Sequence, residues 1–227
     1  MANNLYDVWW TDQSEGEQLM EDTHHRHWQK VVDMLLETDL RSSTILDFGC
    51  NQGGFLRFLY RQRPFARGVG VDLARKSVEV ANARKDDLPV TYVATATLAP
   101  YAAQFDLAIS SAVIYLIDDL LYHAREIRHA LKPGGVYYGT YSDYRGNPSL
   151  PRMREAINRH GAVTMQEHTL DDIAQAFQTQ GFAVSLRLMP PAGYIPVTLP
   201  DRFFGSLADR MLYQYQQAYI FRFVAPD

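Results

Sequence analysis

The residues with the clearest chemical potential form a glycine-rich turn after an apolar run. Residues 45–48 predict a buried strand, and a helix is predicted over 53–62. The letters DFGCNQGG from Asp47 to Gly54 place one glycine between the two and two more at the start of the helix. Glycine lets the backbone approach a ligand closely. The free N–H groups at the start of a helix favour an anionic group such as a carboxylate. The turn therefore predicts a binding site with backbone contacts.

An acidic residue lies near the end of the next apolar run. Asp72 belongs to a strand predicted over 68–73 and follows Asp47 by 25 positions. A carboxylate in this position can accept two hydrogen bonds from a ribose diol. Open parallel sheets bind ligands beyond the carboxyl ends of their strands, so we expect Asp72 and the glycine turn to converge. Together they predict a nucleoside site.

The elements that must position these residues alternate in the manner of βαβ units on a parallel sheet. The apolar runs predict strands over 45–48, 68–73, 90–94, 105–111 and 135–141. Helices are predicted between them over 53–62, 74–85 and 119–131. The letters LKPGG at 131–135 end the last of these helices and turn the chain into the fifth strand.

The segments before and after this region do not show the regular alternation of strands and helices. Helices are predicted over 27–36, over 149–160, and from an N-cap at Thr169 to a stop at Gly181. The first of them has an apolar side formed by Trp28, Val31, Val32, Leu35 and Leu36. Residues 182–188 and 219–224 predict two more strands without a βαβ crossover between them, which indicates an antiparallel pair at one edge of the sheet.

Composition narrows the class of protein. The chain has 227 residues, 47% of them hydrophobic and 21% charged, which is typical of a globular protein with one main core. The formal net charge of −4 disfavours a nucleic-acid partner. The lone Cys50 excludes an internal disulfide. The first ten residues lack a secretory pattern, and the apolar run 107–117 is too short to cross a bilayer. We expect a cytoplasmic protein without a membrane partner.

The motifs resemble those of the class I S-adenosylmethionine-dependent methyltransferases. Asp47-x-Gly49 with Gly53 is similar to motif I of that family, although Asn51 departs from it. The segments 70–73 (GVDL), 105–108 (FDLA) and 131–135 (LKPGG) are similar to three further family elements in the same order. The resemblance covers about residues 43–141. It implies a single domain with a doubly wound, mostly parallel seven-stranded sheet, an antiparallel edge strand and helices on both faces, the Rossmann-like methyltransferase fold.

The resemblance also assigns cofactor contacts. Asp47 would approach the methionine amino group, Asp72 would hold the ribose hydroxyls, and Leu73 would lie against adenine. An acid that contacts the adenine amino group in many members is missing after the third strand, so Thr95 or a backbone carbonyl must substitute. The remaining predicted cofactor residues are Gly49, Cys50, Asn51, Gln52 and Gly53 in the turn, Ala96 after the third strand, and Ser110 and Ser111 after the fourth.

Methyl transfer from a sulfonium is a direct displacement, so alignment and exclusion of water can supply most of the rate. A base helps if the acceptor is a hydroxyl or an amine. Tyr115 and Tyr141 are the predicted catalytic residues, with Asp143 and His168 also near the expected mouth. The histidines and acids of the N-terminal stretch fit no metal-ligand spacing and are interpreted as a solvated helix face: Glu17, Glu21, Asp22, His24, His25 and His27. The sequence predicts no metal site.

These observations predict an S-adenosylmethionine-dependent methyltransferase with a small-molecule acceptor. The acceptor site is expected between a cap segment, 1–40, and two insertions, 143–168 and 189–215. Tyr6, Trp9 and Trp10 either form a lid over the cofactor or fill a groove on the sheet. One alternative is a cofactor-binding regulatory or partner protein without transferase activity. A nicotinamide-dependent oxidoreductase is a second alternative, and Asn51 argues against it because a dinucleotide fingerprint requires glycine there. The oligomeric state stays open.

Overall fold

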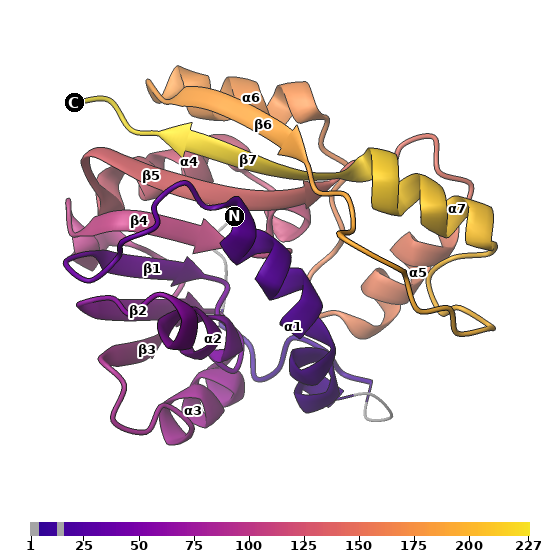
Figure 1. The fold of residues 1–227 in the computed structure, drawn as a ribbon, viewed down its shortest axis with the longest axis horizontal. Coiled ribbons are helices and arrows are strands. Elements are labelled where there is room, and N and C mark those ends of the chain that lie inside the picture. The colour runs from indigo at the N-terminus through magenta and orange to yellow at the C-terminus, as the bar shows by residue number, and fades with distance from the viewer. Residues whose placement is uncertain (1–4, 13–15) are drawn as a thin grey trace.

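A seven-stranded sheet forms the centre of the molecule. The computed structural model describes residues 5–12 and 16–227, and the strand order is β3-β2-β1-β4-β5-β7-β6 (Figure 1). Neighbours among the first five strands are parallel, whereas β7 runs antiparallel to both β5 and the edge strand β6. The predicted mostly parallel sheet with an antiparallel pair at one edge is confirmed. The strands are β1 (Thr44–Phe48), β2 (Arg67–Asp72), β3 (Val90–Ala94), β4 (Phe105–Ser110), β5 (Leu131–Ser142), β6 (Ala183–Leu188) and β7 (Ala218–Val224).

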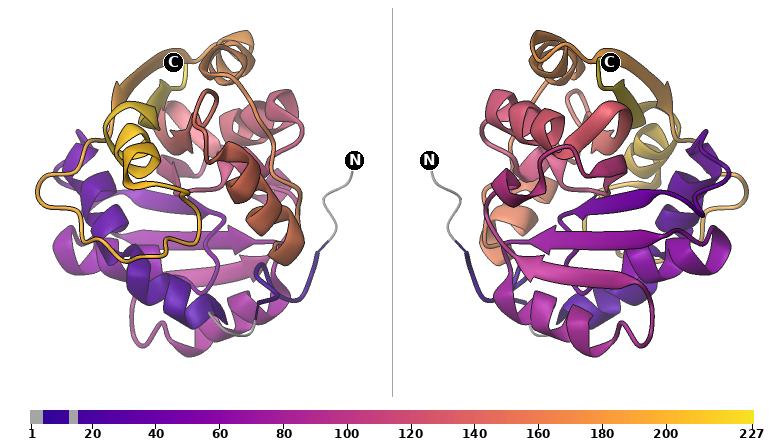
Figure 2. Two further views of the ribbon diagram at one scale, coloured as in Figure 1. Left: turned by 90° about the vertical axis from the view of Figure 1, so that its right-hand side faces the viewer. Right: turned by 90° about the vertical axis from the view of Figure 1, so that its left-hand side faces the viewer.

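Helices cover both faces of the sheet, as predicted. Alternate strand residues point to opposite faces, so Ile45 packs in the core beneath α1, α2 and α3, while Leu46 packs in the core beneath α4 and α6. Two further helices, α5 and α7, lie beyond the carboxyl ends of β1 and β4 (Figures 1 and 2). The helices are α1 (Gly16–Met34), α2 (Gly54–Gln62), α3 (Arg75–Ala83), α4 (Leu120–Ala130), α5 (Leu150–His160), α6 (Leu170–Thr179) and α7 (Leu207–Leu212).

A third apolar cluster lies apart from these two cores. It joins the N-terminal segment, α5 and the stretch that precedes α7, and its buried members are Trp9, Trp10, Met153, Ile157, Met165 and Phe204. These segments belong to the predicted cap and to the two predicted insertions. The cluster therefore covers the end of the sheet at which a ligand is expected.

The structure corrects two predicted boundaries in ways that affect the site. Helix α1 begins at Gly16 rather than at residue 27, and it ends at Met34, so Leu36 lies beyond its end and is 66% exposed. Strand β5 begins at Leu131, because this residue pairs with Phe105 before an irregularity shifts the register. The cap at Thr169 is confirmed by a reciprocal pair of hydrogen bonds with Asp172. No helix among the described residues has the length and apolar character needed to cross a bilayer.

Candidate functional site

A cavity of about 1350 Å³ lies at the carboxyl ends of the parallel strands. The segments that follow β1, β2, β3 and β4 line one part of it. The N-terminal segment, α1, α4, the end of β5, α5 and the stretch before β7 line other parts. Figure 2 (left) views this edge of the sheet. Sites for single small ligands occupy roughly 300–1,000 Å³. The cavity is therefore large enough for a nucleoside ligand with a second molecule beside it.

The glycine turn adopts backbone conformations that side chains disfavour. Gly49, Asn51 and Gly53 have φ values of 82°, 44° and 75°. A Cβ atom on Gly49 would lie 2.4 Å from the Val113 side chain, and one on Gly53 would lie 2.4 Å from the Tyr92 ring. Asn51 stands where the family pattern has glycine, and it adopts the left-handed conformation that asparagine tolerates better than most residues. The departure at Asn51 therefore leaves the shape of the turn intact.

Asp72 and the glycine turn meet directly, as expected. One carboxylate oxygen of Asp72 accepts a hydrogen bond from the Asn51 backbone N–H at 2.7 Å, and the other accepts one from Ala74 N–H at 2.8 Å. The Cys50 N–H donates to the Val71 carbonyl at 3.0 Å. These bonds fix the turn against the end of β2. Each carboxylate oxygen of Asp72 retains a free lone pair for a further donor.

Asp47 presents a buried carboxyl group that lacks a full set of partners. The residue is 2% exposed, and its Oδ2 atom has no hydrogen-bond partner among the described residues. Burial, together with the charge of Asp72, raises the pKa of Asp47 to about 8. The Asn51 Oδ1 atom is buried and unpartnered in the same region. Unsatisfied buried oxygens indicate a missing donor, and a ligand ammonium group fits this place because it supplies both the hydrogen bonds and the opposite charge.

The predicted cofactor residues divide into those that line the cavity and those that do not. Gln52 directs its side chain to Glu17 and Arg84, and Gly53 lies beneath the Tyr92 ring. Ser110 is fully buried in β4, since successive strand residues face opposite ways. The cavity lining contains the other predicted cofactor residues: Asp47, Gly49, Cys50, Asn51, Asp72, Leu73, Thr95, Ala96 and Ser111.

An acid approaches the cavity near β3 from a helix that the sequence did not implicate. Glu126 of α4 lines the cavity, and its Oε2 atom accepts hydrogen bonds from the Thr97 hydroxyl at 2.8 Å and the Leu98 N–H at 2.7 Å. The Thr95 hydroxyl is used locally, because it donates to the Thr97 carbonyl at 3.0 Å. Glu126 therefore places an acid close to the position after the third strand where this chain lacks the acid of the family pattern. Nothing in the local sequence around residue 126 signals this contact.

Glu17 is buried, so its prediction as part of a solvated helix face is wrong. The residue is 7% exposed. Its carboxylate accepts hydrogen bonds from the Trp9 backbone N–H at 2.6 Å, from the Gln52 side chain at 3.2 Å and from the Ser77 hydroxyl. It thereby joins the N-terminal segment, the glycine turn and α3. The side chains of Glu21 and Asp22 lie outside the part of the chain that the structure describes.

The N-terminal segment closes one side of the cavity. Tyr6 donates its N–H to the Leu73 carbonyl at 2.9 Å, and the Trp9 carbonyl accepts from Ala162 N–H at 2.9 Å. Tyr6, Trp9 and Trp10 line the cavity, and the two tryptophans also pack in the third apolar cluster. The segment therefore acts as a wall of the site and as a packing element at once. Residues 1–4 and 13–15 of the predicted cap lie outside the described residues.

Mostly aromatic side chains line another part of the cavity, which we call the aromatic chamber. They are Trp10, Tyr115, Tyr144, Met153, Ile157, Phe203, Phe204 and Tyr213. The rings of Tyr144 and Tyr213 stack with centroids 5.2 Å apart. Burial, with the neighbouring Tyr213 phenol, raises the pKa of Tyr115 above its usual range. Tyr115 therefore stays protonated at neutral pH and is suited to donating a hydrogen bond.

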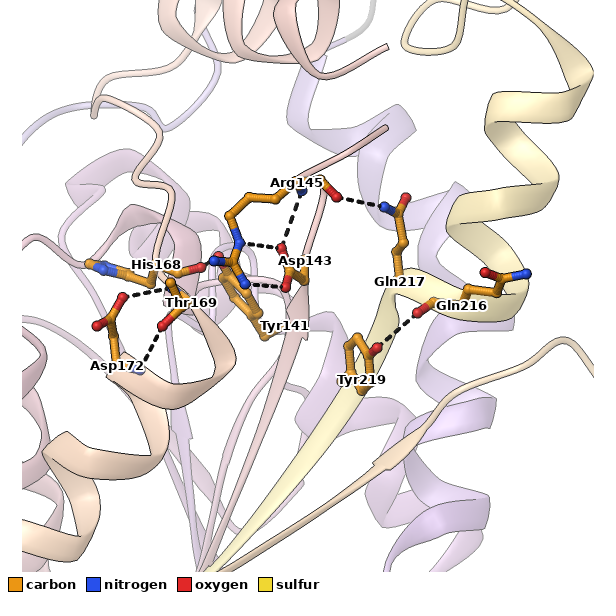
Figure 3. Close-up of polar contacts among 9 residues, drawn as sticks. All are labelled: Tyr141, Asp143, Arg145, His168, Thr169, Asp172, Gln216, Gln217 and Tyr219. Carbon is orange, nitrogen blue, oxygen red and sulfur yellow. Dashed lines mark hydrogen bonds and ion pairs between the residues drawn. The ribbon is translucent and has the colours of Figure 1, made fainter. Parts of the chain in front are cut away.

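The other candidate bases are held by partners near α6. The Tyr141 hydroxyl donates to the His168 carbonyl, and burial raises the pKa of Tyr141 (Figure 3). Asp143 accepts two hydrogen bonds from the Arg145 guanidinium, at 2.6 and 2.8 Å, which lowers the pKa of Asp143. The His168 Nε2 atom lies 2.6 Å from the Ile117 carbonyl, which fixes the proton on that nitrogen. Of the four candidates, Tyr115 and Tyr141 line the cavity.

Comparison with known proteins supports the resemblance drawn from the motifs. The chain is 30% identical to trans-aconitate 2-methyltransferase of Rhodopseudomonas palustris (strain BisB18) over 136 residues, 59% of this chain and 49% of that protein. It is 25% identical to the human mitochondrial arginine-hydroxylase NDUFAF5 over 112 residues, 48% of this chain and 32% of that protein. The chain thus spans about half and about a third of the lengths of these two relatives.

The fold is shared with a Haloferax volcanii protein that was solved in complex with the Trm112 methyltransferase activator. The TM-score is 0.78 at 22% identity, with 93% of this chain and 94% of the other covered. Residues 20–187 match a family model described as a methyltransferase domain. This match covers more than half of the sequence, so the chain belongs to the methyltransferase-domain family.

Proposed function

We propose that this chain binds S-adenosylmethionine and transfers its methyl group to a small-molecule acceptor. The observation that carries the proposal is the unpartnered Oδ2 atom of Asp47, beside Asp72, in a cavity that continues into the aromatic chamber. A cofactor with an ammonium group, a ribose and a cationic sulfur suits these acids. S-adenosylmethionine, when bound, supplies a methyl group on a positively charged sulfur that is already an activated leaving group.

The cofactor contacts follow from the donors and acceptors that line the cavity. Asp47 would accept from the ammonium group, and Asp72 would accept from the ribose hydroxyls through its remaining lone pairs. The backbone of the glycine turn would line the methionine part. Leu73 would lie against the adenine, and Glu126 would accept from the adenine amino group through its Oε1 atom. Together with the buried Glu17, the two aspartates favour a cationic cofactor over its neutral demethylated product.

The acceptor is proposed to bind in the aromatic chamber between the cap segment 1–40 and the insertions 143–168 and 189–215. The chamber side chains are apolar or aromatic, so they exclude water from the path of the displacement and hold the acceptor in line with the sulfur. Tyr115 would donate a hydrogen bond to the acceptor. A chamber lined by buried apolar and aromatic side chains favours a small acceptor over a macromolecule, and one relative is named for a small carboxylic acid.

A second candidate function keeps the cofactor and drops the methyl transfer. One relative is named as an arginine hydroxylase, and the polar candidates of this site are protonated phenols or residues already engaged by partners. A protein that binds S-adenosylmethionine without transferring its methyl group would have the same cofactor contacts. A subunit that works with an activator is compatible with either candidate, since the Haloferax volcanii protein was solved with one.

The test combines binding with turnover. The protein is incubated with S-adenosylmethionine and with trans-aconitate, aryl carboxylic acids, phenols and primary amines in turn, and S-adenosylhomocysteine is quantified by chromatography. We expect one acceptor class to raise product formation well above the rate without acceptor. Asp72→Asn should abolish this increase, whereas Asp87→Asn, the same change at an exposed position, should not alter it. Saturable cofactor binding without transfer to any compound would favour the second candidate.

A further inference from the structure

One part of the cavity lining is not used by the proposed transfer. It lies between α1 and the linker, by which we mean residues 189–200 of the segment that joins β6 to α7. His24, His27 and Lys30, spaced three residues apart along α1, line the cavity here. Residues three apart on a helix are neighbours on one face. Met189, at the start of the linker, and Trp28 of α1 belong to the same core cluster, and both line the cavity.

Two of these groups lack partners among the described residues. The buried Nε2 atom of His27 has no hydrogen-bond partner among the described residues. Lys30 forms no ion pair with any residue that the structure describes. The Asp33 carboxylate, one turn further along the helix, also lines the cavity and accepts a hydrogen bond from Gln29 at 2.8 Å. The face therefore offers an unpartnered imidazole nitrogen and an ammonium group without an ion pair to an anionic ligand.

The opposite wall adds no negative charge. Residues 189–200 include no charged side chain. The other titratable or charged groups of this part of the lining are Arg26 and Asp33 on α1, Tyr194 on the linker, Tyr219 on β7, and Arg210 on α7, which pairs with Asp201 at 3.4 Å. Burial and the neighbouring His24 and Lys30 lower the pKa of His27 to about 4, so its imidazole is neutral at pH 7 in the free protein.

We propose that His24, His27 and Lys30 form a subsite for an anionic group of the acceptor, a carboxylate or a phosphate, whose apolar body extends toward the aromatic chamber. This inference rests on the proposed function, because it names the class of acceptor for the same cavity. An anion in contact with His27 would favour the imidazolium form, so binding would take up a proton. Affinity for the anion would then rise as the pH falls.

The experiment uses two probes of matched shape, 4-phenylbutanoate and its neutral amide 4-phenylbutanamide. Each is titrated calorimetrically into the free protein and into protein saturated with S-adenosylhomocysteine, at pH 6, 7 and 8. His27→Gln and Lys30→Met remove the basic groups, and His25→Gln is the control. His25 is the adjacent histidine of the same helix, and its ring stacks on Phe58 outside the cavity lining.

We expect the carboxylate to bind at least tenfold more tightly than the amide, and more tightly at pH 6 than at pH 8. His27→Gln and Lys30→Met should each reduce that preference by at least fivefold, while His25→Gln leaves it unchanged. The imidazole proton signal of His27 should shift toward the charged form on binding. Equal affinity for the two probes, no binding of either, or a preference that survives both substitutions would overturn the subsite.

The outcomes separate this inference from the proposed function. A protein that fails to bind S-adenosylhomocysteine but still prefers the carboxylate probe would retain the anion subsite and lose the methyltransferase proposal. A protein that binds S-adenosylhomocysteine but treats both probes alike would retain the cofactor site and lose the subsite. Circular dichroism of each variant would establish that the fold is intact before affinities are compared.

Discussion

The substitution Asp47→Asn should stabilise the free protein while it destroys the cofactor site. The pKa of Asp47 rises from 3.8 to about 8 on folding, because its carboxyl is buried beside Asp72. The folded state then binds a proton more tightly than the unfolded state, so the free energy of unfolding falls as the pH rises from about 4 to about 8. Each pH unit in this window is worth about 1.4 kcal/mol. At pH 7 the ionisation penalty is about 4 kcal/mol.

Asparagine has nearly the same shape and carries no charge, so it removes this penalty. Urea unfolding of the free protein at pH 5, 6, 7 and 8 should show an Asp47→Asn stabilisation that grows with pH and levels off above pH 8. Asp87→Asn, the same change at an exposed position, should give a flat difference. S-adenosylmethionine should raise the melting temperature of the wild type and leave Asp47→Asn unchanged. A stabilisation that does not depend on pH, or a variant that still responds to the cofactor, would refute the reasoning.

Four further substitutions test the surrounding contacts. Glu126→Gln keeps an oxygen acceptor for its backbone partner but replaces Oε1 with an N–H donor. The preference for S-adenosylhomocysteine over its inosine analogue, measured by calorimetry, should therefore fall about tenfold or more. An unchanged preference would show that Glu126 does not contact the adenine. Glu17→Ala leaves the Trp9 N–H without its acceptor and should cost about 1–3 kcal/mol of unfolding free energy in urea titration, and a neutral effect would contradict this anchoring role. Tyr115→Phe should lower the transfer rate by less than about tenfold and leave the dependence of the rate on pH unchanged. A loss of about a hundredfold or more, together with loss of the basic limb of the pH–rate profile, would instead identify Tyr115 as a general base. Tyr141→Phe should leave the rate unchanged, because that hydroxyl donates to a backbone carbonyl.

The sheet was predictable because its signals are local. The buried run 45–48 lies within β1, and the run 90–94 coincides with β3, because short apolar segments bounded by turn residues have few alternative structures. Helix α1 was not predictable over its full length. Its first turns lack an apolar stripe and are held by Glu17, whose partners at positions 52 and 77 lie far along the chain. Local periodicity cannot report such tertiary contacts.

The candidate site divides in the same way. The glycine turn and Asp72 were predictable because backbone conformation and strand ends leave marks in the sequence. Ser110 was predicted as a cofactor residue, but its side chain is buried in the core. Successive strand residues face opposite ways, so the next residue, Ser111, lines the cavity instead. Glu126 was missed because its approach depends on how α4 packs against the segment after β3, where Thr97 and Leu98 donate to it. The histidines of α1 looked like a solvated face because nothing in their spacing signals the linker opposite them.

The central claim is that the glycine turn, Asp47 and Asp72 hold one adenosyl cofactor. Calorimetric titration of the wild-type protein with S-adenosylhomocysteine and with NAD tests it most directly, with the 2′-deoxyribose analogue of S-adenosylhomocysteine as a third ligand. We expect the wild type to bind S-adenosylhomocysteine saturably and not to bind NAD. The wild type should bind the deoxyribose analogue less tightly than S-adenosylhomocysteine, whereas Asp72→Asn should bind the two with equal affinity. Binding of NAD in preference to S-adenosylhomocysteine, or equal binding of the ribose and deoxyribose forms, would contradict it.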